Sequence, residues 1–138
     1  MRGAVALQRL HSPQERPVRR RRSCPEQAIQ KAVFAHIDAR GVPGLFAFHP
    51  ANGGWRSAVE AAILTSLGVR PGILDIVCIY QGKIWMLELK APGGKLTAVQ
   101  IDCARRLRRA GATVGTAAGL DEALAWLADH GLLRGVVQ

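Results

Sequence analysis

Residues 73–90 of this 138-residue chain read ILDIVCIYQGKIWMLELK, and this stretch decides the fold. Its two halves, 73–80 and 83–90, are rich in β-branched and aromatic residues, which predicts two β-strands. Gln81 and Gly82 lie between them and fit a two-residue hairpin turn. Side chains alternate along each strand, so one face carries Asp75, Val77, Ile79, Ile84, Met86, Glu88 and Lys90, and the other Leu74, Ile76, Cys78, Trp85, Leu87 and Leu89. Both faces are mostly hydrophobic, as expected for strands that helices cover on both sides.

The two-residue turn fixes the register of this hairpin. Counting outward from the turn places Asp75 directly opposite Glu88 on the neighbouring strand. Paired side chains lie on one face with Cβ atoms about 4.5–5.5 Å apart. Lys90 is two residues beyond Glu88 and therefore shares that face. The sequence thus predicts two carboxylates and one ammonium group close together on a largely apolar surface.

Two carboxylates this close repel each other unless something offsets their charge. One of them can be protonated, Lys90 can bridge them, or a divalent cation can bind between them. The glycine- and proline-containing segments 68–72 and 92–94 leave open backbone around the site, which favours the cation. Magnesium commonly uses one or two carboxylates, together with water and substrate phosphate.

The segments around the hairpin carry helix and turn signals. Ser23 to Glu26 has the form of a capping box with a proline in the first turn, which predicts a helix over 24–39. Apolar spacing and turn residues further predict a strand at 45–48, a loop at 49–54, a helix at 57–67, a helix from Thr97, a strand at 112–116 and a helix at 120–129. The resulting order, α-β-α-β-β-α-β-α, describes an α/β domain with a mixed sheet flanked by helices.

The positive charge of the chain is concentrated at its start. Residues 1–22 contain seven arginines against the single acid Glu15, and they contribute +6 to the formal net charge of +9. We interpret 1–22 as a flexible Arg-rich arm and 23–138 as the domain. A basic arm suits a polyanionic partner such as DNA, although a solubilising tail, a mispredicted start or an Arg-rich transit peptide has the same composition.

Composition excludes several other classes of protein. Hydrophobic residues make up 49% of the chain, but no apolar run approaches the roughly 18 residues of a membrane span. Cys24, Cys78 and Cys103 form no CxxC pair and no zinc pattern with the histidines. We therefore expect reduced cysteines in a cytoplasmic, DNA-associated protein.

Asp75 followed on the next strand by Glu88-Leu89-Lys90 resembles the D…E-x-K core of the PD-(D/E)XK nucleases, and more narrowly the chain resembles a stand-alone VRR-NUC domain. The similarity runs from about Glu26 to the last helix. Matching pieces are Glu26, the run His49-Pro50-Ala51-Asn52-Gly53-Gly54 before Arg56, Gly68 with Pro71-Gly72 before Asp75, and Leu96-Thr97-x-x-Gln100 after the E-x-K triplet. The ordered set is far more specific than D…E-x-K alone.

The resemblance implies a restriction-endonuclease-like fold and a catalytic function. Mg²⁺ or Mn²⁺ would be held by Asp75, Glu88 and the main-chain carbonyl of Leu89, and Lys90 would assist phosphodiester hydrolysis. Similarity to Holliday junction resolvases further implies homodimers that act on branched DNA such as junctions or flaps. The family usually has proline directly before the metal-binding aspartate. Leu74 stands there instead, and because proline contributes no metal ligand we expect activity to survive.

Two further residues are expected to border the site, and each has a simpler alternative. Glu26 lies on the core-facing stripe of its helix, which favours a site role over completing a capping box with Ser23. Gln100 is equally well explained as the capping-box partner of Thr97. Both roles are compatible, because a capped helix end also presents free N–H groups to phosphate.

The expected DNA contacts are mostly basic. Arg105, Arg106, Arg108 and Arg109 form the polar side of the third helix, which is either a solvated face or a track for phosphates. His49 and Asn52 either close over DNA or serve only the turn. The full DNA-binding set that we predict is His49, Asn52, Arg56, Lys95, Arg105, Arg106 and Arg109.

Three functions fit these residues. The first is a metal-dependent, structure-specific DNA endonuclease with Asp75, Glu88, Lys90, Glu26 and Gln100 in its active site. The second is a non-catalytic DNA-binding or assembly module in which Lys90 only neutralises the acids. A sequence-specific restriction enzyme ranks last, because the chain is too short to add a recognition domain.

Overall fold

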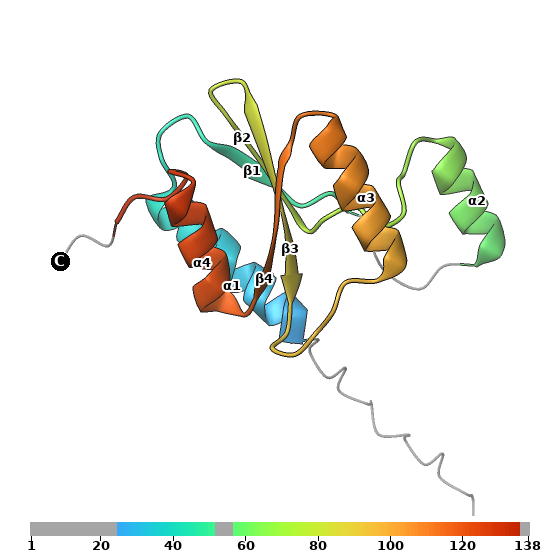
Figure 1. Cartoon of the computed structure of the whole chain (residues 1–138), viewed down its shortest axis with the longest axis horizontal. Coiled ribbons are helices and arrows are strands. Elements are labelled where there is room, and N and C mark those ends of the chain that lie inside the picture. Colours follow the sequence, from blue (N-terminus) through green and yellow to red (C-terminus); the bar gives the residue numbers. More distant parts are fainter. Residues whose placement is uncertain (1–24, 52–56, 136–138) are drawn as a thin grey trace, which may run out of the picture.

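The computed structural model describes residues 25–51 and 57–135, and Figure 1 shows the arrangement of their elements. The four strands form one sheet in the order β1-β2-β3-β4. The elements are α1 (Pro25–Arg40), β1 (Phe46–Phe48), α2 (Ala58–Ser66), β2 (Ile76–Tyr80), β3 (Lys83–Lys90), α3 (Ala98–Arg109), β4 (Thr113–Ala118) and α4 (Leu120–Asp129). Their order confirms the predicted α/β architecture, whereas the arm at 1–22 and the Ser23 cap lie outside the described residues.

The β2–β3 hairpin has the predicted register. Tyr80 pairs with Lys83 and Ile76 pairs with Leu87 in an antiparallel ladder. Gln81 has φ 49° and Gly82 has φ 73°, the two positive values that a type I′ turn requires. β1 is antiparallel to β2 and β4 is parallel to β3, so the sheet is mixed.

The prediction that a strand starts at residue 73 is wrong by three residues, because β2 begins at Ile76. Asp75 therefore lies just before the ladder. Leu74 was expected on the face of Ile76, yet it packs with Val77 and Met86 in the cluster on the α3 side of the sheet. The alternation of faces holds only within a paired strand, and the turn at 71–72 sends the preceding chain along a different path.

Helices cover both faces of the sheet, as predicted. α1 and α4 lie together on one face, over the larger core cluster that contains Ile76, Leu87 and Leu89. α3 lies on the other face, against the smaller cluster around Val77 and Met86. Glu88 and Lys90 are on the α3 face, since they alternate with Leu87 and Leu89 along β3.

The termini of several elements follow local signals. Thr97 caps α3 in a complete capping box with Gln100, and Ser57 caps α2. β4 extends two residues further than predicted, to Ala118. α2 has no buried residue and lies at the side of the molecule beyond α3 (Figure 1). None of the helices in the described ranges is long and apolar enough to cross a bilayer.

Candidate active site

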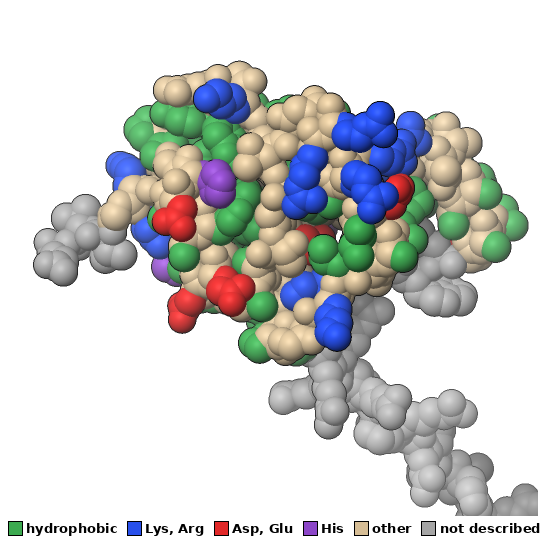
Figure 2. Space-filling view, viewed as in Figure 1, with side chains coloured by type: hydrophobic (Ala, Val, Ile, Leu, Met, Phe, Trp, Pro, Cys, Tyr) green, Lys and Arg blue, Asp and Glu red, His purple; other side chains and the backbone are tan. Residues whose placement is uncertain are grey.

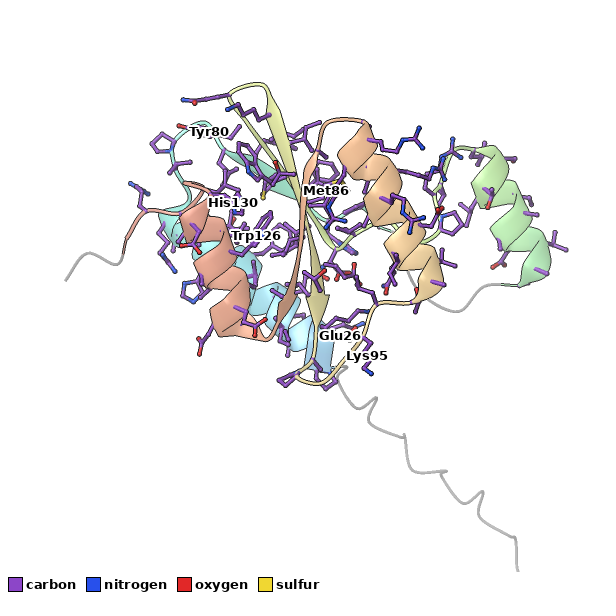
Figure 3. The ribbon with its side chains drawn as sticks, viewed as in Figure 1. Glu26, Tyr80, Met86, Lys95, Trp126 and His130 are labelled. Atoms are coloured by element: carbon purple, nitrogen blue, oxygen red, sulfur yellow. The ribbon has the colours of Figure 1, made fainter. Side chains whose placement is uncertain are left out.

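Four elements meet at the carboxyl end of β3. Glu88 and Lys90 are among the last three residues of the strand, and Asp75 lies just before the neighbouring β2. Gln100 is in the first turn of α3 and Glu26 in the first turn of α1. Figure 3 labels Glu26 near this end of β3. These are the five residues predicted to form the site, and the fold places all of them around one end of β3.

Glu88 is the most deeply buried charged residue of the described chain, at 4% exposure. The side-chain amide of Gln100 donates a 2.6 Å hydrogen bond from Nε2 to Glu88 Oε1. The ammonium of Lys90 lies 3.3 Å from the same oxygen. The other oxygen, Oε2, is buried and has no hydrogen-bond partner among the described residues. Such an atom costs free energy unless a cation or a proton reaches it.

The surroundings of Glu88 raise the pKa of its carboxyl group from 4.5 to about 7. Burial is the largest cause, followed by the negative charge of Asp75. The hydrogen bond and positive charge of Lys90 oppose this shift, and Glu26 adds to it. The negative charges of Asp75 and Glu26 therefore both act on Glu88. A divalent cation would satisfy the same concentration of negative charge.

Asp75 is held by two hydrogen bonds. The N–H of Leu89 donates to Asp75 Oδ2 at 2.8 Å, so the carboxylate takes the place of a strand partner beside β3. Nδ1 of His49 lies 2.6 Å from the main-chain oxygen of Asp75. The N–H and C=O of a strand residue face the same neighbour, so the carbonyl of Leu89 faces the Asp75 side too. This carbonyl is the predicted third ligand.

Lys90 is fixed as well as buried, with 8% exposure. Its carbonyl accepts a 2.9 Å hydrogen bond from the N–H of Gly119. Gly94 allows the following loop to pack against it, because a Cβ at that position would lie 3.3 Å from Lys90 Cβ. In the described residues Lys90 forms an ion pair with Glu88 but none with Asp75. The ammonium thus neutralises one acid and does not bridge the pair.

The donors fit a hard divalent cation of the magnesium type. Within the described ranges, no three His, Cys, Asp or Glu side chains gather into a complete metal cage. The donors would instead be the carboxylates of Asp75 and Glu88 and the carbonyl of Leu89. Magnesium requires no more, since water and phosphate complete its shell. The unpartnered Oε2 of Glu88 is the observation that favours a cation here.

The predicted DNA-binding residues are distributed along α3 and the loops. Figure 2 shows blue side chains gathered over α3, where Arg105, Arg106 and Arg109 are exposed. Arg108 is exposed too, but its Nη2 donates a 3.3 Å hydrogen bond to the carbonyl of Val114. Lys95 is exposed in the loop before α3, near the site in Figure 3. The predicted contacts Asn52 and Arg56 lie outside the described residues.

One feature of the site was not predicted from the sequence. His49 was expected to serve a turn or to contact DNA, and its ring is hydrogen-bonded to the main chain of Asp75. The signal for this bond was the position of His49 directly after β1, the strand that pairs with β2. Gln100 fills both of the roles that the sequence left compatible: its Oε1 accepts from Thr97 N while its Nε2 donates to Glu88.

Comparisons with known proteins agree with the architecture. The sequence matches no family model and has no significant match among curated proteins. A solved structure described as a VRR_NUC domain protein superposes with a TM-score of 0.64 at 19% identity, covering 77% of this chain and 87% of that one. A second, described as a VRR_NUC domain, gives 0.54 at 23% identity and covers 78% and 98%. The chain therefore has the VRR_NUC fold, as predicted from its sequence.

Proposed function

We propose that this protein is a metal-dependent nuclease of the VRR-NUC group that hydrolyses phosphodiester bonds in DNA. The observation that carries the proposal is the buried carboxylate of Glu88, which keeps one oxygen without a partner beside Asp75 and Lys90. A domain with no need for a cation or a catalytic acid gains nothing from this costly arrangement. The likeness to VRR_NUC domains supports the same activity.

Each residue then has a role that its position supports. Asp75, Glu88 and the carbonyl of Leu89 would hold Mg²⁺ or Mn²⁺, which polarises a phosphoryl oxygen and lowers the pKa of a bound water. Lys90 places a positive charge beside the scissile phosphate and stabilises charge that develops in the transition state. Gln100 orients Glu88 through its 2.6 Å hydrogen bond. Glu26 adds negative charge that strengthens cation binding.

We further propose that the substrate is branched DNA, such as a Holliday junction or a flap, and that the protein acts in the cytoplasm. The exposed arginines of α3 support a phosphate-binding surface next to the site. Cys78 and Cys103 are free thiols, which suits a reducing compartment. The preference for branched DNA rests on the resemblance to junction resolvases.

A homodimer is part of the same proposal, because cleavage of both strands of a junction needs two active sites. Phe46, Ile79 and Ile84 are register partners on one face of three neighbouring strands, and all are exposed. α2 exposes Val59 and Ile63 on one side, and Leu67 follows it at 76% exposure. Apolar surface of this extent supports association with another copy. Sedimentation velocity at micromolar concentration tests it: a dimer is expected, and a monomer that cleaves both strands would contradict it.

One observation favours a second candidate, a non-catalytic DNA-binding or assembly module. Lys90 is already paired with Glu88, so the protein can balance part of its buried charge without a metal. Such a module would bind DNA with strong salt dependence, require no divalent cation and release no products. The nuclease proposal predicts the opposite for the last two properties.

Cleavage assays separate the two candidates. Radiolabelled junction, flap, single-stranded and duplex DNA are incubated with Mg²⁺, Mn²⁺ or EDTA, and products are expected only with metal. Asp75→Ala, Glu88→Ala and Lys90→Ala are each expected to reduce cleavage by about 10²- to 10³-fold, the loss typical of removing one group that stabilises transition-state charge. Glu60→Ala and Lys31→Ala, an exposed acid and an exposed lysine elsewhere, are the matched controls. Wild-type rates in all three site variants, or no cleavage of any substrate, would overturn the assignment.

A further inference from the structure

His49 links the end of β1 to the residue that precedes β2. Its Nδ1 lies 2.6 Å from the main-chain oxygen of Asp75. A carbonyl oxygen only accepts hydrogen bonds, so Nδ1 carries the proton and His49 is the donor. The ring therefore binds the main chain of a proposed metal ligand.

The register of the sheet explains why a side chain is needed there. The last pair between β1 and β2 is Phe48 with Val77. Continuing this register places His49 opposite Ile76 and Pro50 opposite Asp75. Proline has no N–H group and cannot donate to the carbonyl opposite it. The imidazole of His49 supplies a donor to the Asp75 carbonyl where the main chain of Pro50 has none.

Asp75 needs such support because it lies outside the paired part of β2. Its carboxylate is attached to β3 through the N–H of Leu89, and its carbonyl is attached to the end of β1 through His49. The two bonds hold the residue from opposite sides. Removing the His49 bond would release the main chain and allow the carboxylate to turn away from Glu88.

We propose that His49 is a positioning residue, which aims the Asp75 carboxylate at Glu88 by fixing the Asp75 main chain, and that it is not a DNA contact. The part of this inference that concerns metal affinity rests on the proposed nuclease function. The part that concerns the geometry of Asp75 does not, and it can be measured in the metal-free protein.

The experiment compares His49→Ala, His49→Asn and His49→Gln. The amide nitrogen of asparagine occupies nearly the same place as Nδ1 of histidine, whereas that of glutamine corresponds to Nε2. His130→Ala is the matched control, because Nδ1 of His130 also lies against a carbonyl, that of Trp126 at 2.7 Å, away from the site. Hydrogen exchange of the Leu89 amide is followed by NMR in EDTA, and Mn²⁺ affinity by calorimetry. DNA affinity is measured in EDTA, and thermal unfolding verifies that each variant is folded.

In the alanine and glutamine variants the Leu89 amide is expected to lose protection, and Mn²⁺ affinity to fall on the order of 10- to 100-fold. Asparagine and the control are expected to match wild type, and DNA affinity in EDTA to stay constant. Unchanged exchange of the Leu89 amide in the alanine variant would overturn the proposal. Equal losses of Leu89 protection in the asparagine and alanine variants would overturn it too, as would a loss of DNA affinity with no change in Leu89 exchange. If wild type binds no Mn²⁺ yet the exchange pattern appears, His49 keeps its role and only the nuclease proposal fails.

Discussion

The carboxyl group of Glu88 lies in surroundings that favour its neutral form. Burial and the charge of Asp75 raise its pKa to about 7, despite the ammonium of Lys90 3.3 Å away. At neutral pH a large fraction of the metal-free protein therefore carries a protonated Glu88. A bound cation would reverse this preference, because positive charge stabilises the carboxylate.

The raised pKa has a consequence for stability in EDTA. The folded protein holds the Glu88 proton up to about pH 7, whereas the unfolded chain releases it near pH 4.5, so the protonated carboxyl stabilises the folded state. This stabilisation is complete below pH 4.5 and is lost as the pH rises to about 7. At about 1.4 kcal/mol per pH unit, the loss is on the order of 3 kcal/mol. Glu88→Gln removes the titrating group, and its free energy of unfolding should lack this decline. Parallel pH profiles for the two proteins, measured by urea denaturation, would contradict the account.

The positions of single residues were predicted correctly where the register of one pair of strands determines them. The two-residue turn fixed the pairing of β2 with β3, and from it the closeness of Asp75 and Glu88 followed. The exit of Asp75 from the ladder did not follow, because it depends on the turn at 71–72 and on the packing of Leu74. The bond from His49 depends on the register of a third strand, which local sequence signals do not report.

At the scale of elements, the start of α3 connects helix stability with the geometry of the site. Gln100 completes the capping box through Oε1 and orients Glu88 through Nε2. Thr97→Ala removes one cap bond and should cost about 1 kcal/mol of stability with little change in kcat. Gln100→Glu keeps the acceptor for Thr97 but replaces the donor to Glu88 with a fourth carboxylate, beside those of Asp75, Glu88 and Glu26.

We expect Gln100→Glu to lower kcat on the order of 10- to 100-fold while its Tm falls no further than that of Thr97→Ala, because it keeps the cap bond that Thr97→Ala loses. Denaturation curves and single-turnover cleavage give the two quantities separately. If Thr97→Ala loses as much kcat as Gln100→Glu does, the contribution of Gln100 is only to the cap.

The contact between β4 and α4 depends on a glycine, Gly115, which has no side chain. A Cβ at Gly115 would overlap the indole of Trp126, which packs against the main core cluster. Gly115→Ala should therefore destabilise the protein by about 1–3 kcal/mol. Gly135→Ala is the control, since nothing lies within 4 Å of a Cβ there. Equal urea midpoints for the two variants would show that α4 adapts without cost.

Elements with strong local signals were predicted almost to the residue. The capping box of α3 and the bounds of α4 and β3 came from sequence alone. The two additional residues of β4 are set by pairing with β3, and the late start of β2 is set by the turn at 71–72 and the packing of Leu74. Pairing and packing of this kind are tertiary effects. The absence of buried residues in α2 could not be predicted from its own sequence either, because that sequence is as apolar as that of a buried helix.

Across the whole molecule, basic side chains gather over α3 (Figure 2), and α3 lies on the sheet face that carries Glu88 and Lys90 (Figure 1). If they follow a DNA strand, removing each side chain that binds a phosphate should reduce the slope of log K against log salt by about 0.9. Combined replacement of Arg105, Arg106 and Arg109 by alanine is expected to flatten the slope accordingly. Lys31→Ala on α1, on the opposite face, should leave it unchanged. Fluorescence anisotropy titrations measure the slopes. Equal slopes for the triple variant and Lys31→Ala would show that the DNA does not follow α3.

Asp75 and Glu88 are proposed to hold one divalent cation between them. Crystals grown in millimolar Mn²⁺ and measured at the manganese absorption edge test it most directly. We predict an anomalous peak within about 2.0–2.4 Å of oxygens from both carboxylates and from the Leu89 carbonyl, with the Lys90 ammonium displaced from Glu88. Density with no such peak, and with Lys90 still paired to Glu88, would contradict the account.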